Sequence, residues 1–162
     1  MNKEYNLAEI FDIAIQIEIN GEKFYREVAA KQSIPAVKTF LLDLAEQEAG
    51  HEKLFRKMQA RFANQTNVDA LNDEFAMLYM QTEATNYVFK SSNDSETVAD
   101  MILCDVLELA MNRERDSILF FMGLKFLMKA VEDKKIIDKL IDEEQFHLAT
   151  LAQFSKKYGM QN

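Results

Sequence analysis

The sequence predicts an all-α fold, an antiparallel four-helix bundle built from two duplicated helical hairpins with a long crossover connection. The 162 residues include only four glycines and one proline, so few residues break a helix. In four segments the apolar residues recur at alternating steps of four and three, the spacing of a helix packed in a bundle. The pattern of the first two segments returns 96 positions later in the last two, as expected for a duplicated hairpin.

Length, composition and charge limit the class of protein. The chain has the length of one domain, residues 1–162, and 48% apolar residues can form a substantial core. The net charge of −8 and the absence of a dense basic run exclude nucleic acid as a partner. Acidic residues interrupt the apolar part of "MNKEYNLAEIFDIAIQIEIN", so no signal peptide or membrane segment is expected. A single cysteine, Cys104, indicates a reducing compartment, and we expect the cytoplasm.

The first hairpin is predicted at about residues 6–62. "KQSIP" supplies a serine cap and a proline suited to the first turn of the second helix. The inward positions of the first helix are Leu7, Phe11, Ala14, Glu18, Gly21, Tyr25 and Val28, and those of the second are Val37, Leu41, Leu44, Glu48, His51, Phe55, Met58 and Phe62.

The crossover, about residues 63–100, is too long for a tight turn. Apolar residues at Leu71, Phe75 and Leu78 predict a short helix within it. The polar stretch "SSNDSET" is a linker, and its Asp94, Ser95 or Thr97 is expected to cap the next helix.

The second hairpin is predicted at about residues 101–158, with its turn near Lys129 to Asp133. The inward positions of its helices are Leu103, Leu107, Ala110, Glu114, Ser117, Phe121 and Leu124, and Ile137, Leu140, Glu144, His147, Leu151, Phe154 and Tyr158.

Four glutamates and both histidines occupy inward positions that the pattern otherwise gives to apolar residues. These are Glu18, Glu48, His51, Glu114, Glu144 and His147. Buried carboxylates are costly when unpaired, and four of them close together repel one another. Two divalent cations would neutralise four carboxylates, because neutral imidazoles add no charge. The pattern therefore predicts a site for two metal ions.

The spacing of these residues agrees with such a site. Residues three apart share one face of a helix, so Glu48 and His51, like Glu144 and His147, can serve one cluster. A single glutamate from each facing helix, Glu18 and Glu114, can bridge the two ions. Carboxylate and imidazole ligands suit iron or manganese, with zinc as a further candidate.

The constellation resembles the rubrerythrin di-iron domain of the ferritin-like superfamily. "AIQIEINGEKFY" and "AMNRERDSILFF" are similar to the first and third helices of that family, and "EAGH" and "EQFH" to its second and fourth. The resemblance covers roughly residues 7–158 and implies that all six side chains are metal ligands. It also implies a non-haem di-iron oxidoreductase that reduces hydrogen peroxide or reacts with dioxygen, and a homodimer.

Two departures from the family pattern affect the expected chemistry. Full-length rubrerythrins add a cysteine-rich rubredoxin-like module, which is not in this sequence, so the electron donor is expected to be separate. Relatives also carry a further glutamate where this sequence has Ser117, and Glu22 is a candidate substitute.

Alternative interpretations remain open at this stage. A ferroxidase or iron-handling protein would use the same ligands, and a non-catalytic helical adaptor would use the acidic surface instead. A lone buried histidine is more often a packed core residue than a ligand. We expect Tyr25 to serve core packing, Arg113 and Arg115 to be surface charges, and Cys104 to be a small buried residue.

Overall fold

The computed structural model describes residues 6–63, 78–84 and 101–158, and all regular structure in these ranges is helical. The long helices are α1 (Leu7–Lys31), α2 (Pro35–Ala63), α4 (Leu103–Leu127) and α5 (Val131–Tyr158). Residues 78–84 form a further helical segment. The predicted all-α bundle is confirmed. Within the described ranges, no helix is both long enough and apolar enough to cross a membrane.

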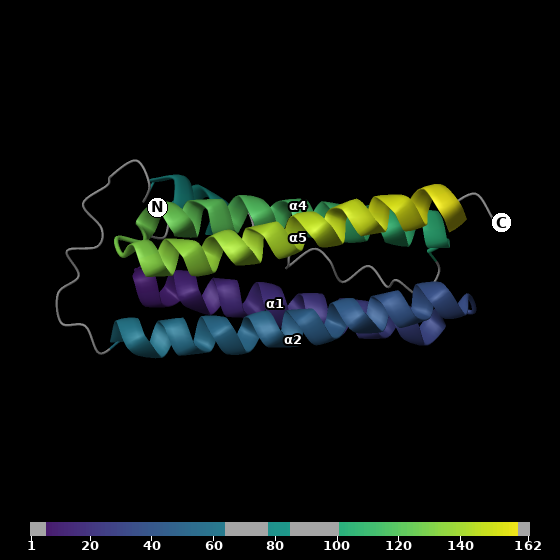
Figure 1. Ribbon diagram of the computed structural model, residues 1–162, viewed down its shortest axis with the longest axis horizontal. Coiled ribbons are helices and arrows are strands. Elements are labelled where there is room, and N and C mark those ends of the chain that lie inside the picture. Colours follow the sequence, from purple (N-terminus) through teal and green to yellow (C-terminus); the bar gives the residue numbers. More distant parts are fainter. Residues whose placement is uncertain (1–5, 64–77, 85–100, 159–162) are drawn as a thin grey trace.

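The four long helices form two hairpins that lie side by side (Figure 1). α1 packs against α2 and α4 against α5, while α1 also contacts α4 and α2 contacts α5. α2 ends at one end of the bundle and α4 begins at the other, so the two run in the same direction (Figure 1). The connection between them must therefore span the length of the bundle, as the sequence predicts.

The bounds of the helices reproduce the duplication. α1 covers residues 7–31 and α4 covers 103–127, which is the same helix shifted by 96 positions at both ends. The turn of the first hairpin is residues 32–34, and that of the second is residues 128–130. The predicted turn near Lys129 to Asp133 is thus slightly late, because α5 already begins at Val131. Applying the 96-residue offset to the first turn gives the correct position.

Two helix starts show how local sequence sets the bounds. Asn6 caps α1: its side chain accepts from the Glu9 N–H at 3.0 Å, and the Glu9 carboxylate accepts from the Asn6 N–H at 2.9 Å. α2 begins at Pro35, which needs no N–H partner in the first turn.

The predicted cap of the third long helix is wrong. α4 begins at Leu103 after Ile102, which makes no side-chain cap hydrogen bond. The expected caps, Asp94, Ser95 and Thr97, lie outside the described residues. α4 therefore starts later than the linker, and tertiary packing rather than a cap side chain sets its first residue.

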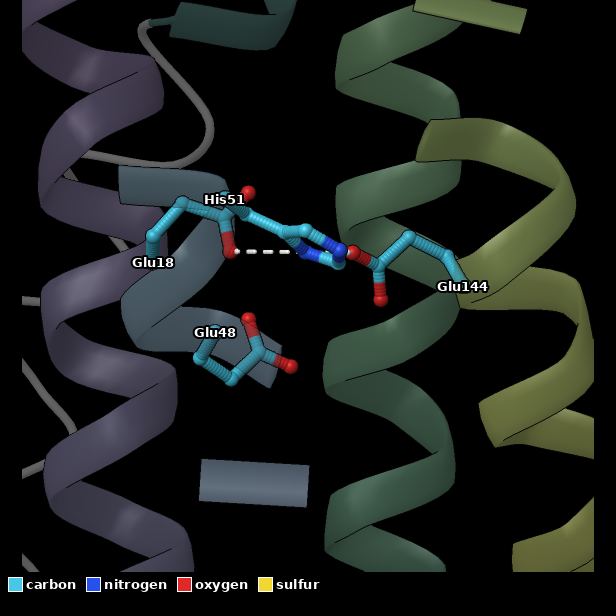
Figure 2. Close-up of side chains that lie close together, drawn as sticks. All are labelled: Glu18, Glu48, His51 and Glu144. Carbon is cyan, nitrogen blue, oxygen red and sulfur yellow. Dashed lines mark ion pairs between the residues drawn. The ribbon is translucent and has the colours of Figure 1, made fainter. Parts of the chain in front are cut away.

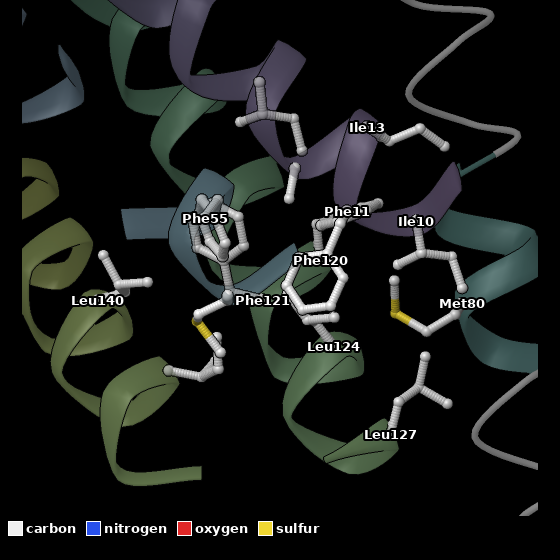
Figure 3. Packing of buried hydrophobic residues seen from close by; sticks show 14 of the residues in the cluster. Ile10, Phe11, Ile13, Phe55, Met80, Phe120, Phe121, Leu124, Leu127 and Leu140 are labelled. Atoms are coloured by element: carbon white, nitrogen blue, oxygen red, sulfur yellow. The ribbon is translucent and has the colours of Figure 1, made fainter. Parts of the chain in front are cut away.

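The apolar core is divided into two clusters. One, drawn in Figure 3, is built around Phe11, Phe55, Phe121 and Leu140, and it also includes Met80. The other lies farther along the bundle and includes residues such as Tyr25, Leu41, Leu107 and Leu151. In each long helix the predicted charged residues fall between the segments that form the two clusters. The apolar layers thus enclose a polar layer.

The helical segment at residues 78–84 covers one side of the first cluster. Met80 and Ala84 are buried in it, whereas Leu78 is 66% exposed. Leu71 and Phe75 lie outside the described residues. Gly123 of α4 allows the close approach, because a Cβ there would lie 2.2 Å from the Met80 Sδ and 2.6 Å from the Tyr79 ring.

Candidate metal centre

All six predicted ligands meet in the polar layer between the two apolar clusters. α1 contributes Glu18, α2 contributes Glu48 and His51, α4 contributes Glu114, and α5 contributes Glu144 and His147. Each of these residues is buried, with at most 5% of its surface exposed. The spacing of the inward positions explains this convergence, because every one of these residues occupies an inward position of its helix.

The ligand atoms form two overlapping groups. One group contains Glu18, Glu48, His51 and Glu144, and the other contains Glu48, Glu114, Glu144 and His147. Within each group, one ligand atom from each residue lies within 4.8 Å of the others. Glu48 and Glu144 belong to both groups. The expectation that Glu18 and Glu114 bridge is therefore wrong: the glutamates of the two Glu-x-x-His motifs occupy the shared position. Each motif starts at the centre of the site, and its histidine reaches to one side.

Both histidines direct Nδ1 toward the carboxylates. His51 Nδ1 lies 3.0 Å from Glu144 Oε1 and 3.5 Å from Glu18 Oε2 (Figure 2). His147 Nδ1 lies 3.2 Å from Glu144 Oε2, 3.7 Å from Glu114 Oε2 and 3.8 Å from Glu48 Oε1. The two imidazole rings are 6.0 Å apart and nearly parallel. Nδ1 is thus the nitrogen of each ring that can bind a metal.

The outer nitrogens have partners that sequence reasoning missed. His51 Nε2 lies 2.7 Å from Glu143 Oε2, and His147 Nε2 lies 3.1 Å from Gln47 Oε1. A carboxylate can only accept, so the Nε2 of His51 carries a hydrogen, and Nδ1 is the nitrogen that can bind a metal once it has lost its own proton. Gln47 and Glu143 are related by the 96-residue offset, and each directly precedes a predicted ligand. Their position next to the ligands, repeated at the 96-residue offset, could have identified both residues from the sequence.

Tyr25 has a more specific role than the core packing expected for it. Its hydroxyl donates a short hydrogen bond to Glu114 Oε1 while its ring packs in the second apolar cluster. Burial, together with the charges of Glu114 and Glu48, raises the pKa of Tyr25 well above its usual value, so the phenol keeps its proton. The preference for packing alone is therefore wrong.

Without a metal, protons must neutralise most of the carboxyl groups. Burial raises the pKa of Glu18 well above its usual range, and the charges of Glu144 and Glu114 add to this. Burial and the charges of Glu18 and Glu144 do the same for Glu48. Burial also raises the pKa of Glu114 to about 8. The exception is Glu144: burial opposes its ionisation, but contacts with Glu114 and both histidines lower its pKa.

The two histidines hold protons because the neighbouring glutamates favour their positively charged form. Burial opposes protonation of His51, but its contact with Glu144 and the surrounding negative charge raise its pKa to about 9. His147 is buried as well, and its contacts with Glu114 and Glu144 raise its pKa to about 10. The site is therefore a cage of acidic oxygens that attracts positive charge.

The donor set fits a pair of divalent cations. Among the six predicted ligands, four buried atoms make no hydrogen bond of good geometry: both carboxyl oxygens of Glu18, His51 Nδ1 and Glu144 Oε1. Buried polar atoms are almost always satisfied, so these four indicate a missing partner. Carboxylate oxygens with one imidazole nitrogen per group suit iron or manganese, and no thiol is among the grouped side chains.

Comparison with known families agrees with this geometry. A family model described as Rubrerythrin matches residues 9–155. The chain belongs to the rubrerythrin family. A solved structure of a chain described as a ferritin-like diiron-carboxylate protein, from Thermotoga maritima, superposes with a TM-score of 0.72 and 29% identity, covering 96% of this chain and 98% of that one. No curated protein matches the chain.

This member of the rubrerythrin family has no carboxylate at position 117. Ser117 is half-buried on α4, and its counterpart on α1 is Gly21. A Cβ at Gly21 would lie 3.1 Å from Glu48 Oε2, so the glycine leaves room for the shared carboxylate. Glu22 does not take the place of the glutamate at position 117, because its Oε1 accepts from Arg26 Nε at 2.8 Å, away from the site. The suggestion that Glu22 compensates is wrong.

Two other expectations for this rubrerythrin-family chain need correction. Arg113 is half-buried rather than a surface charge, and its guanidinium lies over the Phe24 ring at 4.7 Å. Arg115 is exposed, as expected, and donates to Asn112 Oδ1 at 2.6 Å. Cys104 is only half-buried, because it lies in the first turn of α4.

Proposed function

We propose that the chain is a non-haem di-iron redox protein that reduces hydrogen peroxide, with dioxygen as the alternative oxidant. The observation that carries the proposal is the pair of overlapping ligand groups that share Glu48 and Glu144. Two groups that share two carboxylates would hold two ions side by side, where both could act on one oxygen–oxygen bond. Family membership supports the same reaction class.

The six side chains would hold the two ions. Glu18 and His51 lie on one side, Glu114 and His147 on the other, and the shared glutamates lie between them. Bound iron supplies the electrons that reduce the oxygen–oxygen bond of the oxidant. The apolar clusters on both sides limit the access of water to the site.

The surrounding residues orient the ligands and control protons. Tyr25 donates to Glu114 and fixes the position of that carboxylate. Glu143 and Gln47 accept from the outer nitrogens of the histidines and fix the ring orientation. A separate protein or reductant that returns electrons to the metal pair is part of the proposal. A homodimer remains part of the proposal.

Anaerobic reconstitution tests the proposed reaction. Metal-free protein is loaded with two equivalents of Fe(II) and mixed with peroxide in a stopped-flow instrument, and formation of the ferric absorption band is followed. We expect oxidation faster than that of the same Fe(II) in buffer, and loss of the advantage in the double variant Glu48→Gln, Glu144→Gln. Glu46→Gln is the control, because Glu46 is an exposed α2 carboxylate paired with Arg26.

The result separates the competing functions. Oxidation no faster than that of free iron, in protein shown to bind two ions, would exclude the peroxide reaction. Turnover of many Fe(II) ions per chain with dioxygen would instead identify a ferroxidase. Protein that binds no metal at all would favour the adaptor.

A further inference from the structure

The two halves of the metal centre are related by the 96-residue offset, yet their surroundings differ. Glu18 and His51 correspond to Glu114 and His147. If the neighbouring residues were also duplicates, the two positions would bind cations equally. Two pairs of neighbours break this equivalence, one beside the histidines and one beside the glutamates.

The first difference is at the outer nitrogen of each histidine. His51 Nε2 lies 2.7 Å from the carboxylate of Glu143, whereas His147 Nε2 lies 3.1 Å from the amide oxygen of Gln47. The orientation of the amide is fixed, because the Gln47 Nε2 donates to the Asp43 carbonyl at 3.3 Å. An anionic acceptor makes an imidazole a stronger electron donor than a neutral acceptor does.

The second difference concerns Glu18 and Glu114, the two glutamates that each belong to only one group. Tyr25 donates a hydrogen bond to Glu114, which draws negative charge away from that carboxylate. The 96-residue offset relates Glu114 to Glu18 and Tyr25 to Phe121, and Phe121 has no hydroxyl to donate. Neither oxygen of Glu18 makes a hydrogen bond of good geometry. Once it has lost its proton, Glu18 therefore offers a cation more negative charge than Glu114 does.

Both differences act in the same direction. We propose that the two positions are unequal: the position at Glu18 and His51 binds its cation more tightly and fills first, and the position at Glu114 and His147 is the weaker one that exchanges. This inference rests on the proposed metal pair. Loss of a partner of a metal-binding histidine typically weakens binding 10-fold to 100-fold, and the Glu143 side chain is 54% exposed. Because solvent screens it, we expect a difference of about tenfold.

Titration with Mn(II) tests the inequality without redox chemistry. Binding of Mn(II) to metal-free protein is measured by calorimetry and by loss of the electron paramagnetic resonance signal of free Mn(II). We expect two steps separated by about tenfold or more. Glu143→Gln should weaken the tight step and bring the two together, whereas Gln47→Glu should strengthen the weak step. Asp142→Asn is the matched control, because it removes an exposed charge next to Glu143 on α5.

Anomalous diffraction assigns the steps to positions. Crystals grown with one equivalent of Mn(II) should show higher occupancy beside Glu18 and His51 than beside Glu114 and His147. Two Mn(II) ions bound with equal affinity, or higher occupancy beside His147, would overturn the inequality and leave the metal pair intact. Protein that binds no Mn(II), Fe(II) or Zn(II) would overturn both proposals.

Discussion

Glu18, Glu48 and Glu114 show at the scale of single residues what a bound cation would neutralise in this core. Burial disfavours the ionised form of each side chain, and in the absence of a cation the raised pKa values keep them protonated. His51 and His147 hold protons as well. A cation must therefore displace protons from its own ligands before it can bind.

This competition predicts how the stabilising effect of a cation depends on pH. The folded-state pKa values of Glu114, His51 and His147, about 8, 9 and 10, exceed the ordinary values. The stability that these protons give the metal-free protein is therefore fully present at pH values below the ordinary pKa values. It is lost as pH rises through the folded-state pKa values. Cation binding has the opposite trend, because each displaced proton favours it by about 1.4 kcal/mol per pH unit.

The measurement is the melting temperature with and without saturating Mn(II), taken from about pH 6 to about pH 8. We expect Mn(II) to raise the melting temperature by an amount that grows with pH. Glu144, whose pKa is lowered, titrates below this window and does not alter the sign. A stabilisation by Mn(II) that is constant, or that shrinks as pH rises, would contradict this assignment of protons.

At the scale of helices, the packing of residues 78–84 depends on Gly123. Adding a Cβ at Gly123 brings it against both Met80 and the Tyr79 ring. Tyr79 also donates to the Leu119 carbonyl at 3.2 Å, so this segment contacts α4 both at Gly123 and at Leu119. A larger residue at position 123 must displace the segment or strain α4.

The variant Gly123→Ala tests this packing. We expect the free energy of unfolding to fall by about 1–3 kcal/mol in urea titrations. Gly50→Ala is the matched control, because a Cβ at Gly50, also within a helix, would meet nothing within 4 Å. That change should stabilise the protein by about 0.5–1 kcal/mol, since alanine favours helix more than glycine does. Equal effects of the two substitutions would show that the contact with residues 78–84 is unimportant.

The helices also show what the sequence could and could not predict. The alternating spacing of apolar residues and the 96-residue repeat were sufficient for the two hairpins and the six converging side chains. The predicted cap of α4 was wrong, because tertiary packing rather than a polar side chain sets the start of that helix. The role of the shared glutamates was also wrong: spacing within one helix does not reveal which carboxylate faces the opposite hairpin.

At the scale of the whole molecule, the polar layer joins the two hairpins. The grouped side chains come from all four long helices. In addition, His51 of α2 contacts Glu143 of α5, and His147 of α5 contacts Gln47 of α2. The contact between Arg61 and Asp133 links the same two helices nearer one end of the bundle. A bound metal pair would therefore hold together hairpins that are otherwise joined by a long connection.

Anomalous diffraction from crystals of protein loaded with excess Fe(II) without oxygen tests the central claim, that the six side chains hold two metal ions, most directly. Data collected on both sides of the iron absorption edge identify the element as well as its position. We expect two iron peaks, with Glu48 and Glu144 between them and one histidine Nδ1 bound to each. No iron peak in the polar layer, or iron bound only at surface carboxylates, would contradict it.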